Sequence, residues 1–179
     1  ERIDRLRPDQ ICRRGIARTF QIVRPMRGLT VLENVMIGAL FGSNRRESRA
    51  IAEQRARDIL QEVGLTKRAE DPAGSLTLAG HKRLEIARAL ATGPKLLMLD
   101  EVIAGLTPTE AREAAALIGD LRKHHNLTIL MIEHVLAALM RLAERLIVFH
   151  HGVVIGQGTP EQISRDPQVI EAYLGKKHG

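Results

Sequence analysis

The stretch Leu96-Leu97-Met98-Leu99-Asp100-Glu101 decides the fold class of this chain of 179 residues. Four consecutive apolar residues have the length of a strand buried on both faces, as the strands of parallel sheets are. Gly93-Pro94 stands just upstream and ends the helix that we expect before the strand. The two carboxylates follow at the carboxyl end of the strand, where open α/β sheets bind their ligands. The chain is therefore predicted to be an α/β protein with a site beside Asp100 and Glu101.

Helices and strands alternate on both sides of this strand. Apolar residues at steps of three and four predict the helices, and capping boxes at Thr30 and Thr107 mark where two of them begin. The expected helices span residues 31–39, 46–63, 81–91 and 108–124, with another from 134 and two short ones opening at 159 and 166. The expected strands span residues 19–23, 96–99, 128–132, 146–149 and 153–155. This order predicts a mostly parallel sheet, with the last two strands as an antiparallel hairpin at one edge.

Composition excludes several classes of protein. The hydrophobic fraction of 44% and the charged fraction of 27% are close to globular averages, which excludes disordered and fibrous chains. The single cysteine, Cys12, excludes a disulfide framework or a cysteine-based zinc cluster and fits a reducing compartment. A net charge of +6 permits a nucleic-acid partner, but with 2% aromatic residues the chain lacks the stacking platforms that single strands need. No apolar run approaches the roughly 18–20 residues that span a bilayer.

Asp100 and Glu101 carry the clearest chemical motif. Four apolar residues followed by an aspartate form the Walker B pattern, in which the carboxylate helps to hold Mg²⁺ on a nucleotide phosphate. The glutamate that follows can orient a water for attack on the terminal phosphate. An acidic corner between a strand and a loop is the alternative, and this motif alone leaves both open.

The segment from Leu76 to Gly80 lies just ahead of the expected helix over 81–91. Small residues and the Thr77 hydroxyl before a helix form an anion site, because free backbone N–H groups and the positive end of the helix dipole point there. An ordinary helix cap is the alternative interpretation of the same residues.

Five segments in this order together resemble an ATP-binding cassette (ABC) ATPase. The resemblance rests on Thr19-Phe20-Gln21 as the Q-loop, Leu76 to Gly80 as the signature that reads L-S-G-G-Q in the family, Leu99-Asp100-Glu101 as Walker B with the catalytic glutamate, Ala104 to Thr107 as the D-loop, and Ile132-Glu133-His134 as the switch histidine. Leu76 lies 24 residues before Asp100, as in the family. The tail from Gly158 to Gly175 resembles that of importers of branched-chain amino acids.

The resemblance implies a P-loop NTPase-like fold with a mostly parallel sheet, flanking helices and an inserted helical subdomain. Residues 31–83 would form that subdomain and dock on a membrane protein, 84–158 would form the core, and 159–179 a helical tail. The implied cofactors are ATP and Mg²⁺. The fold is expected to lack its N-terminal β part, because the P-loop G-x-x-x-x-G-K-[ST] occurs nowhere in the chain. We therefore expect a sequence truncated just after the P-loop helix, inactive by itself.

The family roles transfer residue by residue. The resemblance implies that Gln21 contacts Mg²⁺ or the attacking water, Asp100 holds Mg²⁺ through water, Glu101 acts as the base and His134 contacts the terminal phosphate. Thr77, Ala79 and Gly80 would complete the ATP site of another subunit, with the D-loop residues Gly105, Leu106 and Thr107 beside them.

Several positions depart from the family pattern. Ala79 stands at the second glycine of the signature and Gly80 at its glutamine, so that a methyl group would crowd the nucleotide. Val102 replaces the usual proline after the glutamate, and Thr107 replaces the usual D-loop aspartate.

The implied partners are a second ABC ATPase subunit, in a homodimer or heterodimer, hydrophobic permease subunits, and indirectly a periplasmic or extracellular solute-binding protein. The implied place is the cytoplasmic face of the cell membrane, and no nucleic acid is expected. A soluble ABC-type ATPase acting on DNA or ribosomes and a non-catalytic module that keeps only the fold are the two alternatives. The transported solute is not identified by any residue of the chain.

Other conspicuous residues have simpler interpretations. Cys12 is interpreted as structural. The pairs His124-His125 and His150-His151 lack a third ligand at a suitable spacing and are interpreted as solvated turn residues. The arginines of residues 13–27 are interpreted as a solvated surface near the docking face.

Overall fold

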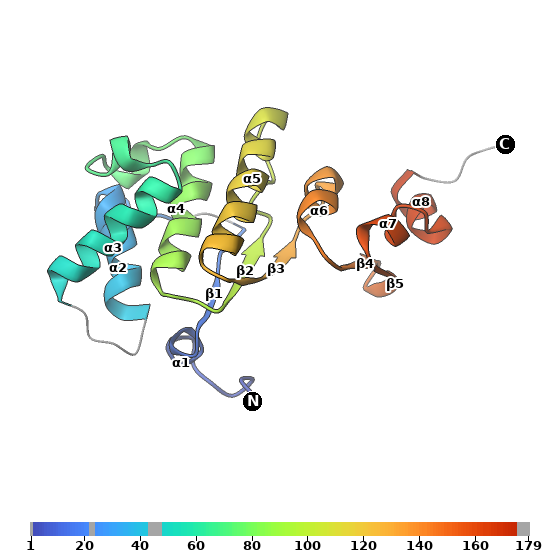
Figure 1. Ribbon diagram of the computed structural model, residues 1–179, viewed down its shortest axis with the longest axis horizontal. Helices are drawn as coiled ribbons and strands as arrows, with labels where there is room; N and C mark the ends of the chain where they lie inside the picture. Colours follow the sequence, from blue (N-terminus) through green and yellow to red (C-terminus); the bar gives the residue numbers. More distant parts are fainter. Residues whose placement is uncertain (1, 22–23, 43–47, 175–179) are drawn as a thin grey trace. The chain divides into compact units, whose positions relative to one another are not determined.

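Three parallel strands form the sheet of the first structural unit, residues 1–134 (Figure 1). A computed structural model describes residues 2–21, 24–42 and 48–174 of the chain. The strands are β1 (Ile16–Arg18), β2 (Leu96–Asp100) and β3 (Thr128–Ile132), in the order β1-β2-β3. The parallel register pairs Arg18 with Met98 and Asp100 with Ile132. Leu97 and Leu99 of the central strand are buried, so the apolar run around which the prediction was built is a core strand.

The first strand lies upstream of its expected position at 19–23. It ends at Arg18, and one further backbone bond, from Thr19 N to Met98 O (2.9 Å), continues the ladder. The buried hydroxyl of Thr19 then accepts the N–H of Asp100 (3.0 Å), and Phe20 N donates to a carboxylate oxygen of Glu85 (2.7 Å). The side chains of Thr19 and Glu85 thus bond where a longer strand would need backbone partners, and the predicted strand is wrong for residues 19–21. Residues 22–23 lie outside the described part of the chain.

Three helices pack side by side in this unit: α2 (Val31–Gly42), α3 (Arg49–Glu62) and α4 (Leu78–Ala91) (Figure 1). The Thr30 capping box is confirmed, since Thr30 N donates to Glu33 (2.8 Å) and Glu33 N donates to the Thr30 hydroxyl (3.1 Å). A methyl group at Gly38 of α2 would overlap the carbonyl oxygen of Arg88 in α4. The glycine therefore permits the two backbones to approach closely. The expected start of α3 at residue 46 lies outside the described residues.

The long helix α5 (Pro108–His124) has the predicted bounds. Its start is fixed because Thr107 N donates to Glu110 (2.9 Å), Glu110 N donates back to the Thr107 hydroxyl (3.3 Å), and a proline occupies the first turn. One face buries Ala114, Ala115, Ile118 and Leu121. Two short 3₁₀ turns, η1 (Thr66–Arg68) and η2 (Ala73–Ser75), lead from α3 to α4.

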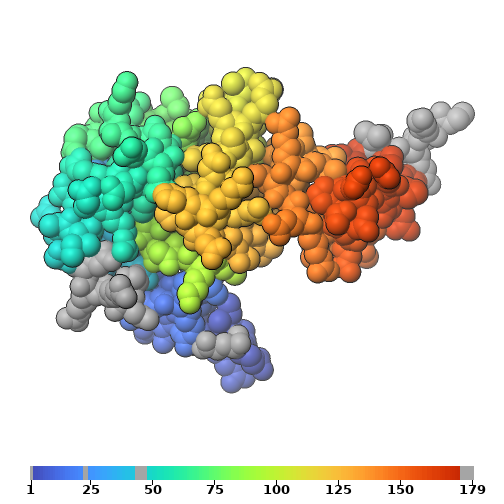
Figure 2. All heavy atoms as spheres, viewed as in Figure 1, coloured from blue at the N-terminus to red at the C-terminus, as the bar shows by residue number. Residues whose placement is uncertain are grey.

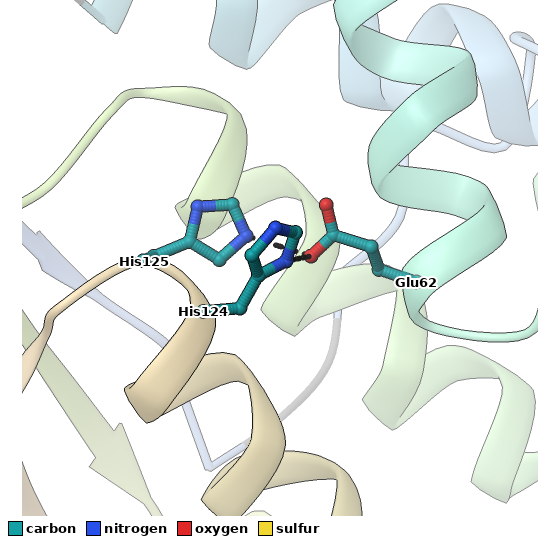
Figure 3. Close-up of side chains that lie close together, drawn as sticks. All are labelled: Glu62, His124 and His125. Atoms are coloured by element: carbon teal, nitrogen blue, oxygen red, sulfur yellow. Dashed lines mark hydrogen bonds and ion pairs between the residues drawn. The ribbon is translucent and has the colours of Figure 1, made fainter.

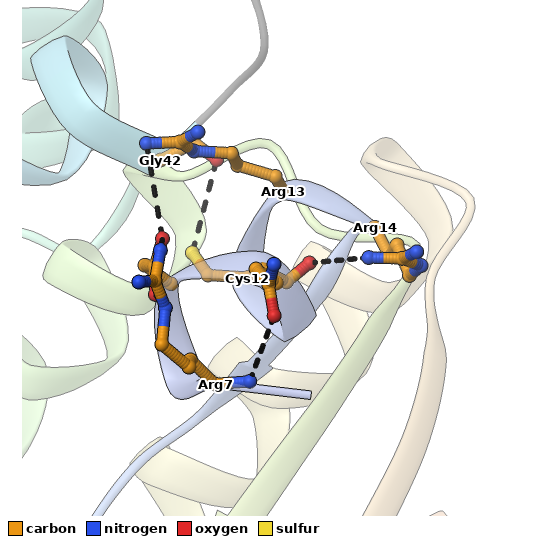
Figure 4. Close-up of polar contacts among 7 residues, drawn as sticks. Arg7, Cys12, Arg13, Arg14 and Gly42 are labelled. Carbon is orange, nitrogen blue, oxygen red and sulfur yellow. Dashed lines mark hydrogen bonds and ion pairs between the residues drawn. The ribbon is translucent and has the colours of Figure 1, made fainter. Parts of the chain in front are cut away.

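The basic N-terminal stretch, expected to be irregular, contains the helix α1 (Pro8–Arg13). Arg7 N donates to the side chain of Gln10 (3.0 Å), and the proline stands at the first helical position. Cys12 contacts the end of α2, with its sulfur 3.8 Å from the carbonyl oxygen of Gly42 (Figure 4). The space-filling view shows this N-terminal segment in dark blue (Figure 2).

The second unit, residues 135–179, is built around a hairpin. Its elements are α6 (Leu136–Leu142), β4 (Leu146–His150), β5 (Val153–Gly158), α7 (Pro160–Ile163) and α8 (Pro167–Leu174). Leu146, Ile163 and Val169 form its buried core. The hairpin and both short helices are confirmed, but the hairpin is a separate two-stranded sheet and not the edge of the parallel sheet. Its apolar side chains pack on α7 and α8, which gives β4 and β5 a core of their own.

None of the helices found in the described part of the chain has the length and apolar character that a bilayer span requires. The predicted divisions at 31–83, 84–158 and 159–179 stay predictions.

Candidate functional site

The carboxyl ends of the three parallel strands bring separate polar segments to one edge of the sheet. Thr19 to Gln21 follow β1, Glu101 follows β2, and Glu133-His134 follow β3. The register that pairs Asp100 with Ile132 places the residues after β2 and β3 side by side. Segments more than 30 positions apart in the sequence therefore meet at this edge, where α/β sheets bind ligands.

Glu101 is the centre of the cluster. The side-chain nitrogen of Gln21 donates to Glu101 Oε2 at 2.7 Å, and His134 Nδ1 lies 3.9 Å from Glu101 Oε1. The Glu101 side chain is 28% exposed and that of His134 is 65% exposed. The structure thus brings together all three residues that the sequence predicted to be catalytic, around one partly accessible carboxylate.

The backbone of Glu101 adopts a left-handed conformation, with φ of 48°. Such a conformation costs a residue with a side chain about 1–2 kcal/mol, so neighbouring groups must hold it. Two hydrogen bonds do so: Glu101 N donates to Ile132 O (2.9 Å), and Glu101 O accepts from Lys82 Nζ (2.9 Å). The backbone turn that presents the carboxylate is therefore fixed by β3 on one side and α4 on the other.

Lys82 is the residue that reasoning from sequence missed. It is 6% exposed, and its ammonium group donates to the carbonyl oxygens of Glu101 (2.9 Å) and Gln21 (3.4 Å). It shares the buried face of α4 with Glu85 and Ala89, at steps of three and four residues. Lys82 could have been found because it occupies a position on the face of the helix that the apolar spacing predicts to be buried.

Two further carboxylates support the loops of the site. Glu85 accepts the N–H of Phe20 and Glu133 accepts the N–H of Ile103, each at 2.7 Å. The second carboxylate oxygen of each is buried without a hydrogen-bond partner among the residues that the structure describes. Burial raises the pKa of both Glu85 and Glu133 above the ordinary glutamate value, although the backbone N–H groups act in the opposite direction.

Asp100, the predicted Mg²⁺ ligand, forms an ion pair. Its Oδ2 accepts from Arg18 at 2.8 Å, and its side chain is 20% exposed. Arg18 is exposed, as expected of the N-terminal arginines, and in addition the parallel register of β1 and β2 brings it to the aspartate. Arg18 is itself 54% exposed, and exposed pairs of this kind contribute about 0–1 kcal/mol.

The signature residues form the start of α4. The Thr77 hydroxyl accepts the N–H of Gly80 (3.2 Å), so the threonine is the N-cap of the helix. Thr77, Ala79 and Gly80 line a surface hollow together with Arg83 and Glu110. The helix-cap interpretation is confirmed, and the anion-binding role of these residues stays a prediction.

The D-loop residues lie between Glu101 and α5. Gly105 has φ of 80° and lines an open hollow with Gln21, Lys82 and Glu101. Leu106 is half-buried, and Thr107 caps α5. Threonine at the position of the usual aspartate therefore keeps a side-chain oxygen that can cap the helix.

Comparison with known proteins agrees with this geometry. Residues 2–104 match the family model for ABC transporters, and residues 153–179 match that of branched-chain amino acid ATP-binding cassette transporters. The chain is 41% identical over 188 residues to the high-affinity branched-chain amino acid transport ATP-binding protein LivG of Escherichia coli K12, covering 98% of the chain and 74% of LivG. BraF of Pseudomonas aeruginosa, which carries the same description, is 40% identical with the same coverage.

Solved structures agree as well. The ADP conformation of an ATP-binding cassette of an ABC transporter superposes with a TM-score of 0.80 at 32% identity, over 94% of this chain and 72% of that one. The α/β architecture is therefore the P-loop NTPase fold of ABC ATPase domains. With its family model, its relatives and its fold in agreement, the chain belongs to the ATP-binding proteins of ABC transporters.

Proposed function

We propose that this chain supplies the hydrolytic centre of an ABC importer for branched-chain amino acids or similar small solutes. The observation that carries the proposal is the arrangement of Gln21 and His134 around Glu101 at the carboxyl edge of the parallel sheet. The likeness to LivG and BraF supports the solute class.

Glu101 is the general base in this proposal. Its carboxylate is accessible enough to accept a proton from a water, and Lys82 and Ile132 hold its backbone in place. The Gln21 amide, already bonded to the same carboxylate, orients that water. The His134 imidazole lies near the other carboxylate oxygen of Glu101. In this proposal it contacts the terminal phosphate of the nucleotide.

The donor set fits Mg²⁺. Asp100 offers carboxylate oxygens and Gln21 an amide oxygen, which are the hard ligands that this ion prefers. These two residues would hold the ion, and bound Mg²⁺ neutralises the charge that develops on the phosphates. The exposed Arg18 would then exchange its contact with Asp100 for another partner, at little cost in stability.

ABC ATPase subunits of transporters dimerise and act with permease partners. We infer that Thr77, Ala79 and Gly80 face the ATP of the other subunit in a homodimer or heterodimer, next to the D-loop residues Gly105, Leu106 and Thr107. The helical region 31–83 docks on a hydrophobic permease at the cytoplasmic face of the membrane. A solute-binding protein takes part indirectly, through the permease.

The test is Glu101→Gln in a version of the protein that carries a P-loop. We expect ATP hydrolysis to fall at least about 100-fold, because the carboxamide keeps the shape but cannot accept the proton. ATP binding, measured by equilibrium dialysis, should stay within about twofold, because the change leaves the other nucleotide contacts in place.

Two controls sharpen this experiment. Glu161→Gln changes an exposed carboxylate of α7 and should leave hydrolysis unchanged. The 179-residue chain by itself should show no turnover, because a P-loop supplies most phosphate contacts in the family. Full hydrolysis by the Glu101→Gln protein would show that another residue is the base.

A further inference from the structure

A carboxylate and two imidazole rings meet where helices α3 and α5 end. Glu62 is the last residue of α3, His124 is the last residue of α5, and His125 is its C-cap. Glu62 Oε2 lies 2.6 Å from His125 Nε2 and 3.3 Å from His124 Nδ1. Figure 3 shows both rings beside the carboxylate. Glu62, 62 positions before His124, is thus the third ligand that was not found from sequence spacing for the His124-His125 pair.

We propose that Glu62, His124 and His125 form a binding site for a divalent transition-metal ion such as Zn²⁺. Two imidazole nitrogens and one carboxylate oxygen are the donor set that this class of ion prefers, whereas Mg²⁺ and Ca²⁺ prefer oxygen ligands. Three protein ligands leave the fourth tetrahedral position to a water.

The spacing of the donor atoms fits this ion. With metal–ligand distances of about 2.0–2.2 Å, tetrahedral ligands lie about 3.3 Å from one another. The donor atoms of the three residues all lie within 4.8 Å of one another, and the His124–Glu62 separation is already 3.3 Å. Small side-chain rotations therefore suffice to close the set around an ion.

The surroundings hold the ligands and leave a path for the ion. The side chains of Glu62 and His125 are 22% and 30% exposed, whereas that of His124 is 69% exposed and opens to solvent. The backbone of His125 is fixed by a hydrogen bond from its N–H to Leu121 O (3.0 Å). The negative end of the α5 dipole favours a cation at this place.

The charges around the cluster include some that oppose a bound cation and one that favours it. Arg122 and Lys123 in the last turn of α5 oppose a cation, and the Glu62 carboxylate offsets part of their charge. Coordination needs the lone pair on His125 Nε2, so the proton that this nitrogen shares with Glu62 leaves to solvent when the ion binds. The ion thus replaces a shared proton between the same two atoms.

A bound ion would tie the ends of α3 and α5 together. The cluster lies on residues other than those assigned to nucleotide hydrolysis, so the role is structural. An ion that binds only the folded state raises the free energy of unfolding according to its concentration relative to its Kd. In the space-filling view α3 (cyan) and α5 (yellow to orange) both contribute to the surface that faces the viewer (Figure 2).

The experiment titrates Zn²⁺ into the full-length, tag-free protein without nucleotide, by calorimetry and by the shift in melting temperature. We expect one equivalent to bind and to raise the melting temperature. The double variant Glu62→Gln/His125→Asn should bind at least about tenfold more weakly. Co²⁺, used as a spectroscopic probe, should give the visible absorption of a tetrahedral site in the wild type and lose it in the variant.

Matched variants separate metal binding from a contact that only holds the helices. His124→Asn leaves the Glu62–His125 hydrogen bond intact and should still weaken Zn²⁺ binding about tenfold. His150→Asn/His151→Asn removes the other adjacent histidine pair and should change nothing. Excess Mg²⁺ should not displace Zn²⁺. Equal Zn²⁺ affinity in the wild type and both cluster variants, or loss of binding in the His150/His151 variant, would overturn the proposal.

Discussion

Lys82 places a buried positive charge between two segments that are 80 positions apart in the sequence. Its ammonium group is the partner of the Glu101 and Gln21 carbonyl oxygens, so it positions the backbones on both sides of the site. It contacts these backbones and not the reacting atoms. In the proposed mechanism Lys82 therefore acts indirectly, through the left-handed turn at Glu101.

Lys82→Met should lower the free energy of unfolding by about 1–3 kcal/mol, because the carbonyl oxygens of Glu101 and Gln21 lose the ammonium group that donates to them. In a P-loop-bearing protein kcat should fall while the KM for ATP changes less, since the turn at Glu101 loses its support. Lys123→Met, an exposed lysine of α5, serves as the control. Urea unfolding and steady-state kinetics check the two effects, and an unchanged kcat would mean that Ile132 alone fixes the turn.

The residues of the site could be predicted from the sequence, whereas contacts between residues far apart in the chain could not. Gln21, Glu101 and His134 could be predicted as one site, because their segments resemble the Q-loop, Walker B and switch motifs of ABC ATPases. The end of β1 could not, because the Glu85 carboxylate that takes the Phe20 N–H belongs to a helix 65 positions away. The Glu62–His125 contact spans a similar separation, and no local pattern records it.

The starts of three helices, in contrast, were predictable from local sequence. Thr30, Thr107 and Thr159 each cap a helix through a glutamate or glutamine three residues later, and the bonds that decide this lie within four residues. The close packing of α2 on α4 was not predictable, because it depends on which glycine of α2 meets which carbonyl of α4.

Gly38→Ala tests that packing. Alanine favours a helix over glycine by about 1 kcal/mol, but the added methyl group would overlap the Arg88 carbonyl oxygen and crowd Ala91. We expect a net loss of about 1–3 kcal/mol in the free energy of unfolding, because α2 and α4 must move apart.

Gly28→Ala is the matched control for Gly38→Ala, since a methyl group there has no neighbour within 4 Å. Denaturant unfolding of both variants decides the question. If Gly38→Ala were as stable as Gly28→Ala, α2 and α4 would accommodate the methyl group without loss of stability.

The stability of the whole protein should depend on pH in a direction set by its buried carboxylates. Burial raises the pKa of Glu133 in the folded state above its ordinary value of 4.5, so the folded state binds more protons than the unfolded state. Glu133 therefore contributes to the stability of the folded state below pH 4.5, and this contribution is lost as the pH rises through the raised pKa.

Glu133→Gln should remove this dependence, because the amide can still accept the Ile103 N–H without becoming charged. Relative to the wild type, the variant should gain stability from pH 5 to pH 8 in urea unfolding. Glu110→Gln should instead show its effect at lower pH, because hydrogen bonds from Thr107 lower the pKa of Glu110 below its ordinary value of 4.5. The stabilisation from Glu110 is present above that value and is lost as the pH falls through the lowered pKa. If the difference in the free energy of unfolding between Glu133→Gln and the wild type stayed constant from pH 5 to pH 8, the raised pKa of Glu133 would be contradicted.

The position of Lys82 within α4 has a mechanical consequence. A helix is stiff over a single turn, and Lys82 lies about 6 Å along the axis from Leu78, the residue that follows the Thr77 cap. If the capped end, where the signature residues lie, tilts or slides, Lys82 moves with it as part of the same rigid helix. The hydrogen bond from Lys82 then transmits this movement to the Glu101 carbonyl. In a dimer whose signature faces the other subunit's nucleotide, binding of nucleotide at one site would therefore shift Glu101, the proposed base of the second site.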